Sequence, residues 1–225
     1  MNMNNFQKIQ EISEFVRQEM EGLCAAHDFL HIERVVENAK RIAQGEWEDD
    51  IFVIEIWALL HESLDTKFFP KENKQQRKKD ILHLLESIWL SQEEREEVLF
   101  IIENVGYSKE LQRADDFVWT QNFMIVEDAD RLEAIGAIAI ARCFSYGGKI
   151  RRPIYDPDIH PFEIDGIDSY TQTLSESTSL NHFFEKLLLL KNQMHTQTAK
   201  KFAEPRHTFM QLYVEQFLKE WNGEI

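Results

Sequence analysis

The feature that most constrains the fold of this chain is an apolar run, residues 51–60 (IFVIEIWALL), followed directly by His61 and Glu62. A helix that is apolar all round belongs in a protein interior, so we expect residues 51–62 to form a buried central helix. Side chains of metal-ligand type are costly at the end of such a helix unless they are hydrogen-bonded or bind an ion. The run therefore predicts a site of chemistry where the helix ends.

Helical patterns also account for most of the remaining chain. The 225 residues include only 8 glycines and 5 prolines, and they contain no internal repeat. Apolar residues recur at helical spacing, and Ser91 with Glu94 has the pattern of a capping box. We therefore expect an all-α, single-domain fold. The expected helices cover residues 6–24, 27–43, 51–62, about 71–88, 92–104, a long helix that ends near 144, and two helices within 179–221.

The acidic charge of the chain excludes some classes of partner. A formal net charge of −15 and a pI near 5.0 argue against a general nucleic-acid or membrane-surface binder, because both need a basic face. A small anionic substrate remains compatible, since a divalent ion and a few local basic residues can hold a phosphate. The basic run at residues 71–79 is expected to be a solvated helix surface rather than an attractor of polyanions.

The expected compartment is the cytoplasm. Cys24 and Cys143 lack the spacing of a metal site, so we expect both to be reduced thiols. The sequence shows neither an apolar stretch of membrane length nor a basic and apolar signal at Met1. We therefore expect no membrane contact. A homodimer remains open.

Two other segments offer partners for His61 and Glu62. His31 falls on the first turn of an expected helix for which Asp28 is a plausible N-cap. Asp130 lies in another expected helix, within VEDADRLEAIGA. Two imidazoles and two carboxylates form a mixed nitrogen and oxygen shell, which suits Mn, Mg, Co, Ni, Fe or Zn better than a thiolate-bound metal. A divalent metal site is the first hypothesis.

The motifs that carry these residues resemble a known family. They resemble the HD superfamily of metal-dependent phosphohydrolases, and within it the YpgQ-like subfamily of small bacterial hydrolases. The resemblance extends from about residue 27 to about residue 221. The matching stretches are HDFLH at 27–31 with Arg34 and Val35, LLH at 59–61 with DTKF at 65–68, DADRLEAIGA at 128–137, and HFFEKLL at 182–188.

The resemblance implies both a fold and an activity. It implies an HD-type helical bundle in which residues 6–143 form the core and residues 178–221 pack on it. It also implies a metal-dependent phosphohydrolase that acts on a phosphate ester or anhydride of a small molecule. A nucleotide is the substrate that the resemblance favours, with a nucleoside triphosphate hydrolysed to its monophosphate and pyrophosphate. The metal ligands that it implies are His31, His61, Glu62 and Asp130.

One position departs from the family pattern. The superfamily usually has His-Asp at the second motif, where this chain has His61-Glu62. The extra methylene of glutamate moves the carboxylate by about 1.5 Å, and a metal site tolerates only a few tenths of an ångström. One alternative is therefore a degenerate HD protein that acts as a nucleotide-binding or regulatory module. Another is a helical interaction protein that keeps the fold without the site.

Asp65 and Glu62 are the candidate catalytic residues. Asp65 lies three residues after Glu62, so it is expected beside the metal as a general base toward water or an acid toward the leaving group. Its plain alternative is a turn residue. Asp128 and Asp130 are about 200° apart around a helix. The motif selects Asp130 as the ligand, which leaves Asp128 to orient a ligand or a nearby arginine.

Lys67, His182 and Lys186 are the candidate substrate-binding residues, each able to contact a phosphate. Surface pairing or helix capping is an equally good account of all three. Residues 145–177 hold most of the prolines and no helical stripe, so we expect a long non-helical loop there. Lys149, Arg151 and Arg152 make it locally basic. It could be a flap over substrate phosphates or an ordered connector.

Overall fold

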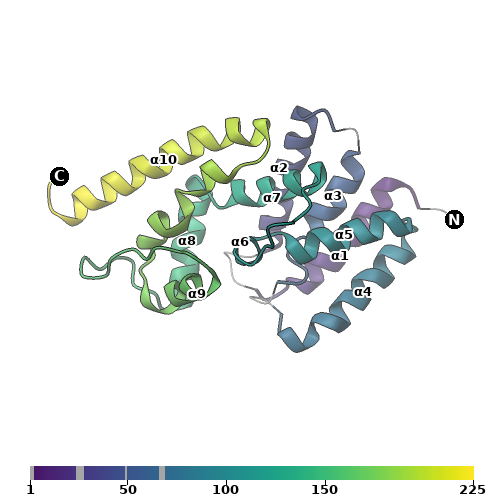
Figure 1. Cartoon of the computed structure of the whole chain (residues 1–225), viewed down its shortest axis with the longest axis horizontal. Coiled ribbons are helices and arrows are strands. Elements are labelled where there is room, and N and C mark those ends of the chain that lie inside the picture. The colour runs from purple at the N-terminus through teal and green to yellow at the C-terminus, as the bar shows by residue number, and fades with distance from the viewer. Residues whose placement is uncertain (1–2, 24–27, 49, 66–68) are drawn as a thin grey trace. The chain divides into compact units, whose positions relative to one another are not determined.

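The computed structural model describes residues 3–23, 28–48, 50–65 and 69–225 of the chain (Figure 1). Every regular element in these ranges is helical, which confirms the prediction of an all-α fold. The contacts divide the chain into two compact units, and the boundary falls between Ala129 and Asp130. The predicted packing of residues 178–221 on a core of residues 6–143 stays a prediction. None of the helices within the described ranges has the length and apolar character of a membrane span.

The first unit is built around its third helix. Its elements are α1 (Asn5–Glu19), α2 (Phe29–Gly45), α3 (Ile51–Leu60), the short 3₁₀ turn η1 (Lys71–Asn73), α4 (Lys74–Ser87), α5 (Gln92–Asn104), α6 (Tyr107–Glu110) and most of α7 (Gln121–Glu133).

The apolar helix α3 packs against α1, α2 and α5 (Figure 1). Trp57, Ile54 and Leu60 are almost completely buried, so the prediction of a buried central helix is confirmed. The helix ends at Leu60 rather than at Glu62, because the next bond runs from the Ser63 amide to the Leu60 carbonyl and closes a tighter turn (2.9 Å). His61 and Glu62 therefore occupy the turn that leaves the helix.

The predicted capping box at the start of α5 is present. The Ser91 hydroxyl accepts a hydrogen bond from the Glu94 amide at 3.2 Å, and the Ser91 amide donates to the Glu94 carboxylate at 2.6 Å. The helix ends at Asn104, as the apolar pattern predicted.

The main part of the second unit starts at Asp130. Its elements are the end of α7, α8 (Ala137–Lys149), α9 (Ile167–Glu176), the π-helical turn η2 (Phe183–Leu187), the 3₁₀ turn η3 (Leu190–Gln193) and α10 (Gln197–Trp221). The long helix α10 packs against α8 and η3. The prediction of two helices in residues 179–221 is wrong in detail, since two short turns precede one long helix.

A glycine divides the long helix predicted to end near residue 144. Gly136 has a φ of +95°, so α7 ends before it and α8 begins after it. A Cβ atom at this position would lie 3.1 Å from the Arg206 Cβ. The Arg206 guanidinium also donates to the Leu132 carbonyl and so satisfies the end of α7. The left-handed backbone and the close approach of α10 both require glycine here.

The predicted non-helical loop at residues 145–177 is shorter than expected. Helix α8 continues to Lys149 and α9 covers residues 167–176, which leaves residues 150–166 irregular. This segment is attached to residues 179–185 by hydrogen bonds, as an ordered connector would be; its role, as a flap or as a connector, stays a prediction. The bonds join the Ser179 amide to the Pro153 carbonyl (2.8 Å), the Leu180 amide to the Ile154 carbonyl (2.9 Å), the Asn181 side chain to the Ile159 carbonyl (2.8 Å) and the Phe162 amide to the Glu185 carboxylate (3.1 Å).

Gly136→Ala should destabilise the protein by about 1–3 kcal/mol, because alanine would be strained at positive φ and would crowd Arg206. Urea unfolding of the variant measures the loss. Gly148→Ala is the matched control, since Gly148 lies inside α8 with open space around it and should be neutral or gain about 0.5–1 kcal/mol. Equal stability of the two variants would contradict this account of the α7–α8 junction.

Candidate metal centre

Three of the four predicted metal ligands lie together in the first unit. His31, His61 and Glu62 each offer one ligand atom, and these atoms all lie within 4.8 Å of one another. The two imidazoles are almost fully buried, with 1% and 3% of their residue surface exposed. The His31 Nε2 atom is 3.5 Å from the Glu62 Oε1 atom. Two imidazoles and a carboxylate thus converge at the end of the central helix.

The position of His31 is set by the start of α2. The Asp28 carboxylate accepts a hydrogen bond from the His31 amide at 3.1 Å, so the predicted N-cap is confirmed. This bond places His31 on the first turn. The fully buried side chains of Ile32 and Val35 hold the same end of the helix in the core.

The ring orientation of His61 is set by its own helix. Its Nδ1 atom lies 2.7 Å from the Ala58 carbonyl oxygen. A carbonyl can only accept a hydrogen bond, so Nδ1 carries a proton, and in the neutral imidazole Nε2 then carries the lone pair. This is the tautomer of an imidazole that binds a metal through Nε2 while its other nitrogen donates to the backbone.

The spacing of one pair of these donors, His31 and Glu62, fits a divalent ion. Two ligand atoms that are each about 2.1 Å from one ion lie about 3.4 Å apart at the tetrahedral angle. The separation of His31 Nε2 and Glu62 Oε1, 3.5 Å, agrees with that value. The longer glutamate side chain therefore still brings its carboxylate to the imidazoles, and the nitrogen and oxygen donor set suits a borderline or hard divalent metal.

The remaining predicted site residues have different outcomes. Asp130 is the first residue of the second unit, and its place as the fourth ligand stays a prediction. Asp65 is half-buried, and its amide donates to the Glu62 carbonyl at 2.9 Å, so it continues the turn that holds the ligands. Lys67 lies outside the described residues. Asp128 is fully buried on α7, and its orienting role stays a prediction.

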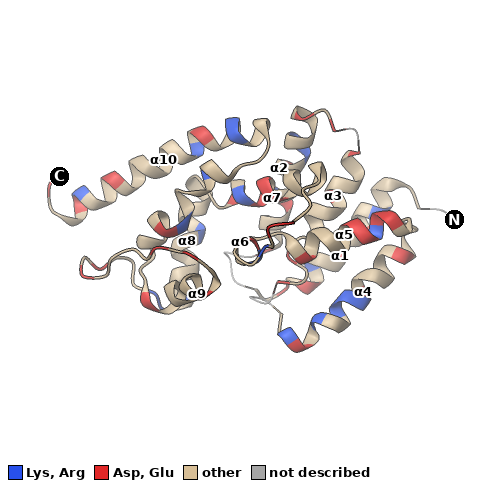
Figure 2. Cartoon of the chain, viewed as in Figure 1, with Lys and Arg blue, Asp and Glu red and all other residues tan. Residues whose placement is uncertain are grey.

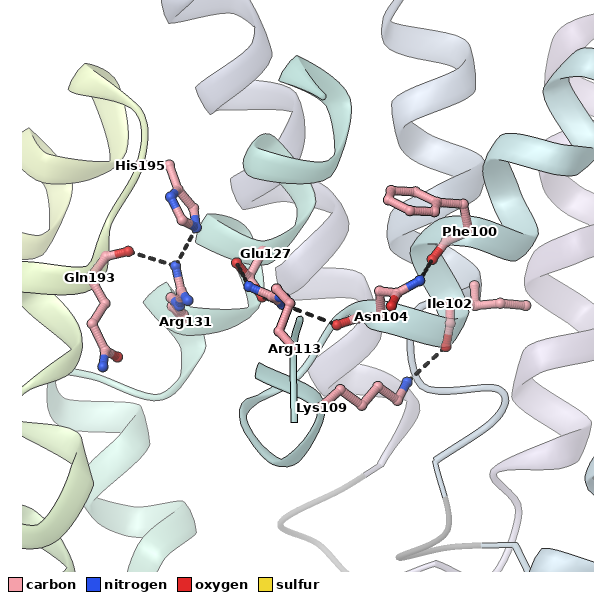
Figure 3. Close-up of polar contacts among 9 residues, drawn as sticks. All are labelled: Phe100, Ile102, Asn104, Lys109, Arg113, Glu127, Arg131, Gln193 and His195. Atoms are coloured by element: carbon pink, nitrogen blue, oxygen red, sulfur yellow. Dashed lines mark hydrogen bonds and ion pairs between the residues drawn. The ribbon is translucent and has the colours of Figure 1, made fainter. Parts of the chain in front are cut away.

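The helix that carries Asp128 and Asp130 is anchored by a buried ion pair that the sequence did not reveal (Figure 3). The Arg113 guanidinium lies 2.5 Å from the Glu127 carboxylate, and their side chains are only 7% and 2% exposed. Arg113 also donates to the Asn104 carbonyl at 3.1 Å. Its charge faces three aromatic rings at 4.7–5.1 Å, those of Phe117, Trp119 and Phe123. Residues 107–120 lie outside the helices that the sequence predicted, and the available signal for this contact was an arginine four residues before Phe117 and six before Trp119.

A second arginine anchors the end of α7 within the second unit. Arg131 donates to the Gln193 carbonyl and to His195 Nε2, both at 2.6 Å (Figure 3). A guanidinium has no acceptor, so His195 Nε2 accepts and His195 carries its proton on Nδ1. Arg131 thereby ties the last turn of α7 to the connection before α10.

His182 and Lys186 lie at the π-helical turn of the second unit. The His182 Nδ1 atom is 3.9 Å from the buried Glu185 carboxylate, and the Lys186 ammonium is 5.7 Å from the centre of the Tyr170 ring. Burial lowers the pKa of His182 to about 4. His182 is therefore neutral near pH 7 and would contact a phosphate only as a hydrogen-bonding group. Its role and that of Lys186 in substrate binding stay predictions.

Arg113→Met should destabilise the protein by about 3–5 kcal/mol, because it leaves the Glu127 carboxylate buried without its guanidinium. The double variant Arg113→Met/Glu127→Gln should recover part of that loss, since no charge is then stranded. Urea unfolding of both variants checks the order. A double variant no more stable than Arg113→Met would contradict the ion-pair account.

The low pKa of His182 makes stability depend on pH. The folded state binds fewer protons than the unfolded chain between the ordinary pKa of 6.5 and the lowered pKa of about 4. Stability should therefore fall as the pH drops through this window, by up to about 1.4 kcal/mol per pH unit from this group. Unfolding of metal-free protein from pH 7.5 to 4.5 should show a shallower dependence for His182→Gln. Parallel curves would show that His182 is not the group responsible.

Comparisons with known proteins identify the family of the chain. No family model matches the chain. An HD-superfamily hydrolase from Bacillus thuringiensis is 37% identical over 97% of this chain and 99% of its own, with a TM-score of 0.73. A Lactobacillus plantarum protein is 30% identical over 99% of this chain and 100% of its own, with a TM-score of 0.83. Bacillus subtilis YpgQ, crystallised in complex with ADP, is 30% identical over 97% of both chains, with a TM-score of 0.74. The chain therefore belongs to the HD superfamily of hydrolases and has its helical fold, as its motifs predicted.

Proposed function

We propose that this protein is a metal-dependent phosphohydrolase that cleaves a phosphate ester or anhydride of a small molecule, with nucleotides as substrates. The reaction that we propose is hydrolysis of a nucleoside triphosphate to its monophosphate and pyrophosphate. The observation that carries the proposal is the buried convergence of His31, His61 and Glu62. A group of this composition at the end of an apolar helix has a clear chemical use as a divalent metal site.

The nucleotide class is supported by a relative. YpgQ was crystallised in complex with ADP, and this chain resembles YpgQ over almost its whole length. An acidic protein can bind such a polyanion when a divalent ion and local basic side chains offset the phosphate charge. Lys67 and Lys186 are the cationic candidates for this contact, with neutral His182 as a hydrogen-bonding one.

The proposed chemistry uses the chain's own residues around one bound ion. His31, His61 and Glu62 would hold the ion, with Asp130 as the proposed fourth ligand. A bound divalent ion lowers the pKa of water and stabilises negative charge on phosphoryl oxygens. Asp65 accepts the proton of the attacking water. The water oxygen bonds to the α-phosphorus, the bond from that phosphorus to the bridging oxygen breaks, and pyrophosphate leaves with the bonding electrons.

The geometry favours this enzyme over the degenerate alternative. In that alternative the glutamate at the second motif weakens or removes the metal, because its carboxylate is displaced. Glu62 instead lies with its Oε1 atom 3.5 Å from His31 Nε2. We attribute this position of the carboxylate to the end of the helix at Leu60, after which Glu62 lies in a turn.

His61→Ala should reduce metal-stimulated release of phosphate and pyrophosphate by about 100-fold or more, because it removes a ligand outright. The assay uses the four nucleoside triphosphates with Mn²⁺, Mg²⁺, Co²⁺ or Ni²⁺, together with metal analysis of protein purified without chelator. His83→Ala is the matched control, since His83 is exposed on α4 and should leave activity unchanged.

Two outcomes would count against the proposal. A fully active, metal-loaded His61→Ala variant would remove His61 from the site. A wild-type protein that binds no metal and is inert, while Glu62→Asp binds metal and turns over, would establish the degenerate alternative. Turnover of wild type with bound metal supports the enzyme, and the substrate panel then identifies the bond that is cleaved.

A further inference from the structure

The turn that carries His61 and Glu62 is held from outside by one residue of α4. The Arg77 Nε atom donates to the Ser63 carbonyl at 3.0 Å. Its Nη1 atom forms an ion pair with the Glu19 carboxylate of α1. Its guanidinium carbon lies 3.3 Å from the centre of the Phe69 ring. Arg77 thus joins α1, α4 and the chain on both sides of the undescribed residues 66–68.

Arg77 differs from the basic run in which it lies. Figure 2 shows lysine and arginine gathered along the first half of α4, where the sequence predicted a solvated surface. Lys71 and Lys79 are exposed, in agreement with that prediction. The side chain of Arg77, by contrast, is only 15% exposed. The prediction is therefore wrong for this one residue, which turns inward to the end of α3.

Arg77 and Glu62 line the same small cavity. Its volume is about 10 Å³, room for about one water molecule. The polar side chains that face it are those of Glu19, Glu62, Ser63 and Arg77. Arg77 therefore borders the proposed metal ligand as well as the backbone one residue after it.

The turn needs a fixed point because it lies outside the helix. Residues 61–65 follow the last residue of α3 and form a turn, whose bonds include one from the Ser63 amide to the Leu60 carbonyl and one from the Asp65 amide to the Glu62 carbonyl. Glutamate also has more rotatable bonds than aspartate, so its carboxylate is placed well only if its backbone is fixed. The bond from Arg77 to the Ser63 carbonyl supplies that restraint.

We propose that Arg77 is a positioning residue for the metal centre: it fixes the turn so that the Glu62 carboxylate reaches His31. This inference rests on the proposed function, because it assumes that the three residues bind an ion. The positive charge of Arg77 is offset by Glu19, so its contribution is geometric and adds little repulsion toward a bound cation. Lysine cannot replace it, since an ammonium does not stack flat on Phe69 while donating in two fixed directions.

The test compares Mn²⁺ affinity in wild type, Arg77→Met and Arg77→Lys after removal of metal by chelation. Both variants should bind Mn²⁺ about 10-fold or more weakly, as happens when a residue that orients a metal ligand is lost. The visible absorption spectrum of the Co²⁺ protein should shift in both, because the ligand geometry changes. Lys78→Met is the matched control: it removes the neighbouring ion pair of α4 with Glu103 and should leave both readouts unchanged.

The outcomes separate this inference from the proposed function. Wild type that binds Mn²⁺ while both Arg77 variants bind it equally well would overturn the inference and leave the metal centre standing. Wild type that binds no Mn²⁺ would overturn both. If Arg77 has a purely structural role, its variants should unfold at a lower temperature without metal but keep the Mn²⁺ affinity and Co²⁺ spectrum of wild type. That result would also overturn the inference. If Arg77→Met does not fold, Arg77→Lys provides the same comparison.

Discussion

The burial of imidazole and carboxylate side chains at the end of an apolar helix is the constraint on which the first unit depends. Helix α3 must lie inside because almost every residue in it is apolar, and this forces His61 and the turn after it into the interior as well. Buried imidazoles and carboxylates need partners. The surrounding elements meet that need: Asp28 caps the turn that carries His31, the Ala58 carbonyl orients His61, and Arg77 ties down the turn that carries Glu62.

The same requirement explains how buried charge is arranged elsewhere in the molecule. Helix α7 buries Glu127, and Arg113 neutralises it inside a group of aromatic rings. In the second unit the buried Glu185 accepts hydrogen bonds from the Ser177 hydroxyl and the Phe162 amide. Each carboxylate thereby ties a stretch of irregular chain to a helical element. Buried ion pairs and hydrogen bonds of this kind are strict about geometry, so they order segments that apolar contacts alone would leave in several arrangements.

The site shows how a departure from a family pattern can be accommodated locally. A glutamate in place of an aspartate would displace the carboxylate if the helix continued unchanged. In this chain the helix stops before the residue, and Arg77 of α4, itself paired with Glu19 of α1, donates to the Ser63 carbonyl in the turn. The substitution and its support lie far apart in sequence. In the fold they meet, and the Glu62 carboxylate lies in one group with the two imidazoles.

Local patterns in the sequence determined much of this protein: the all-α fold, the buried run at α3, the caps at Asp28 and Ser91, and His31, His61 and Glu62 as one group. Each depends on residue spacing or on a motif, and spacing and motifs can both be read directly from the sequence. Tertiary structure alone decided where α3 ends, that Gly136 separates α7 from α8, and that Arg77 and Arg113 are anchors rather than surface charges. The physical reason is that these outcomes depend on partners distant in sequence: Arg206 crowds Gly136, Glu19 and Phe69 draw Arg77 inward, and Glu127 draws in Arg113. The spacing of residues along the chain does not reveal contacts between residues that are distant in sequence.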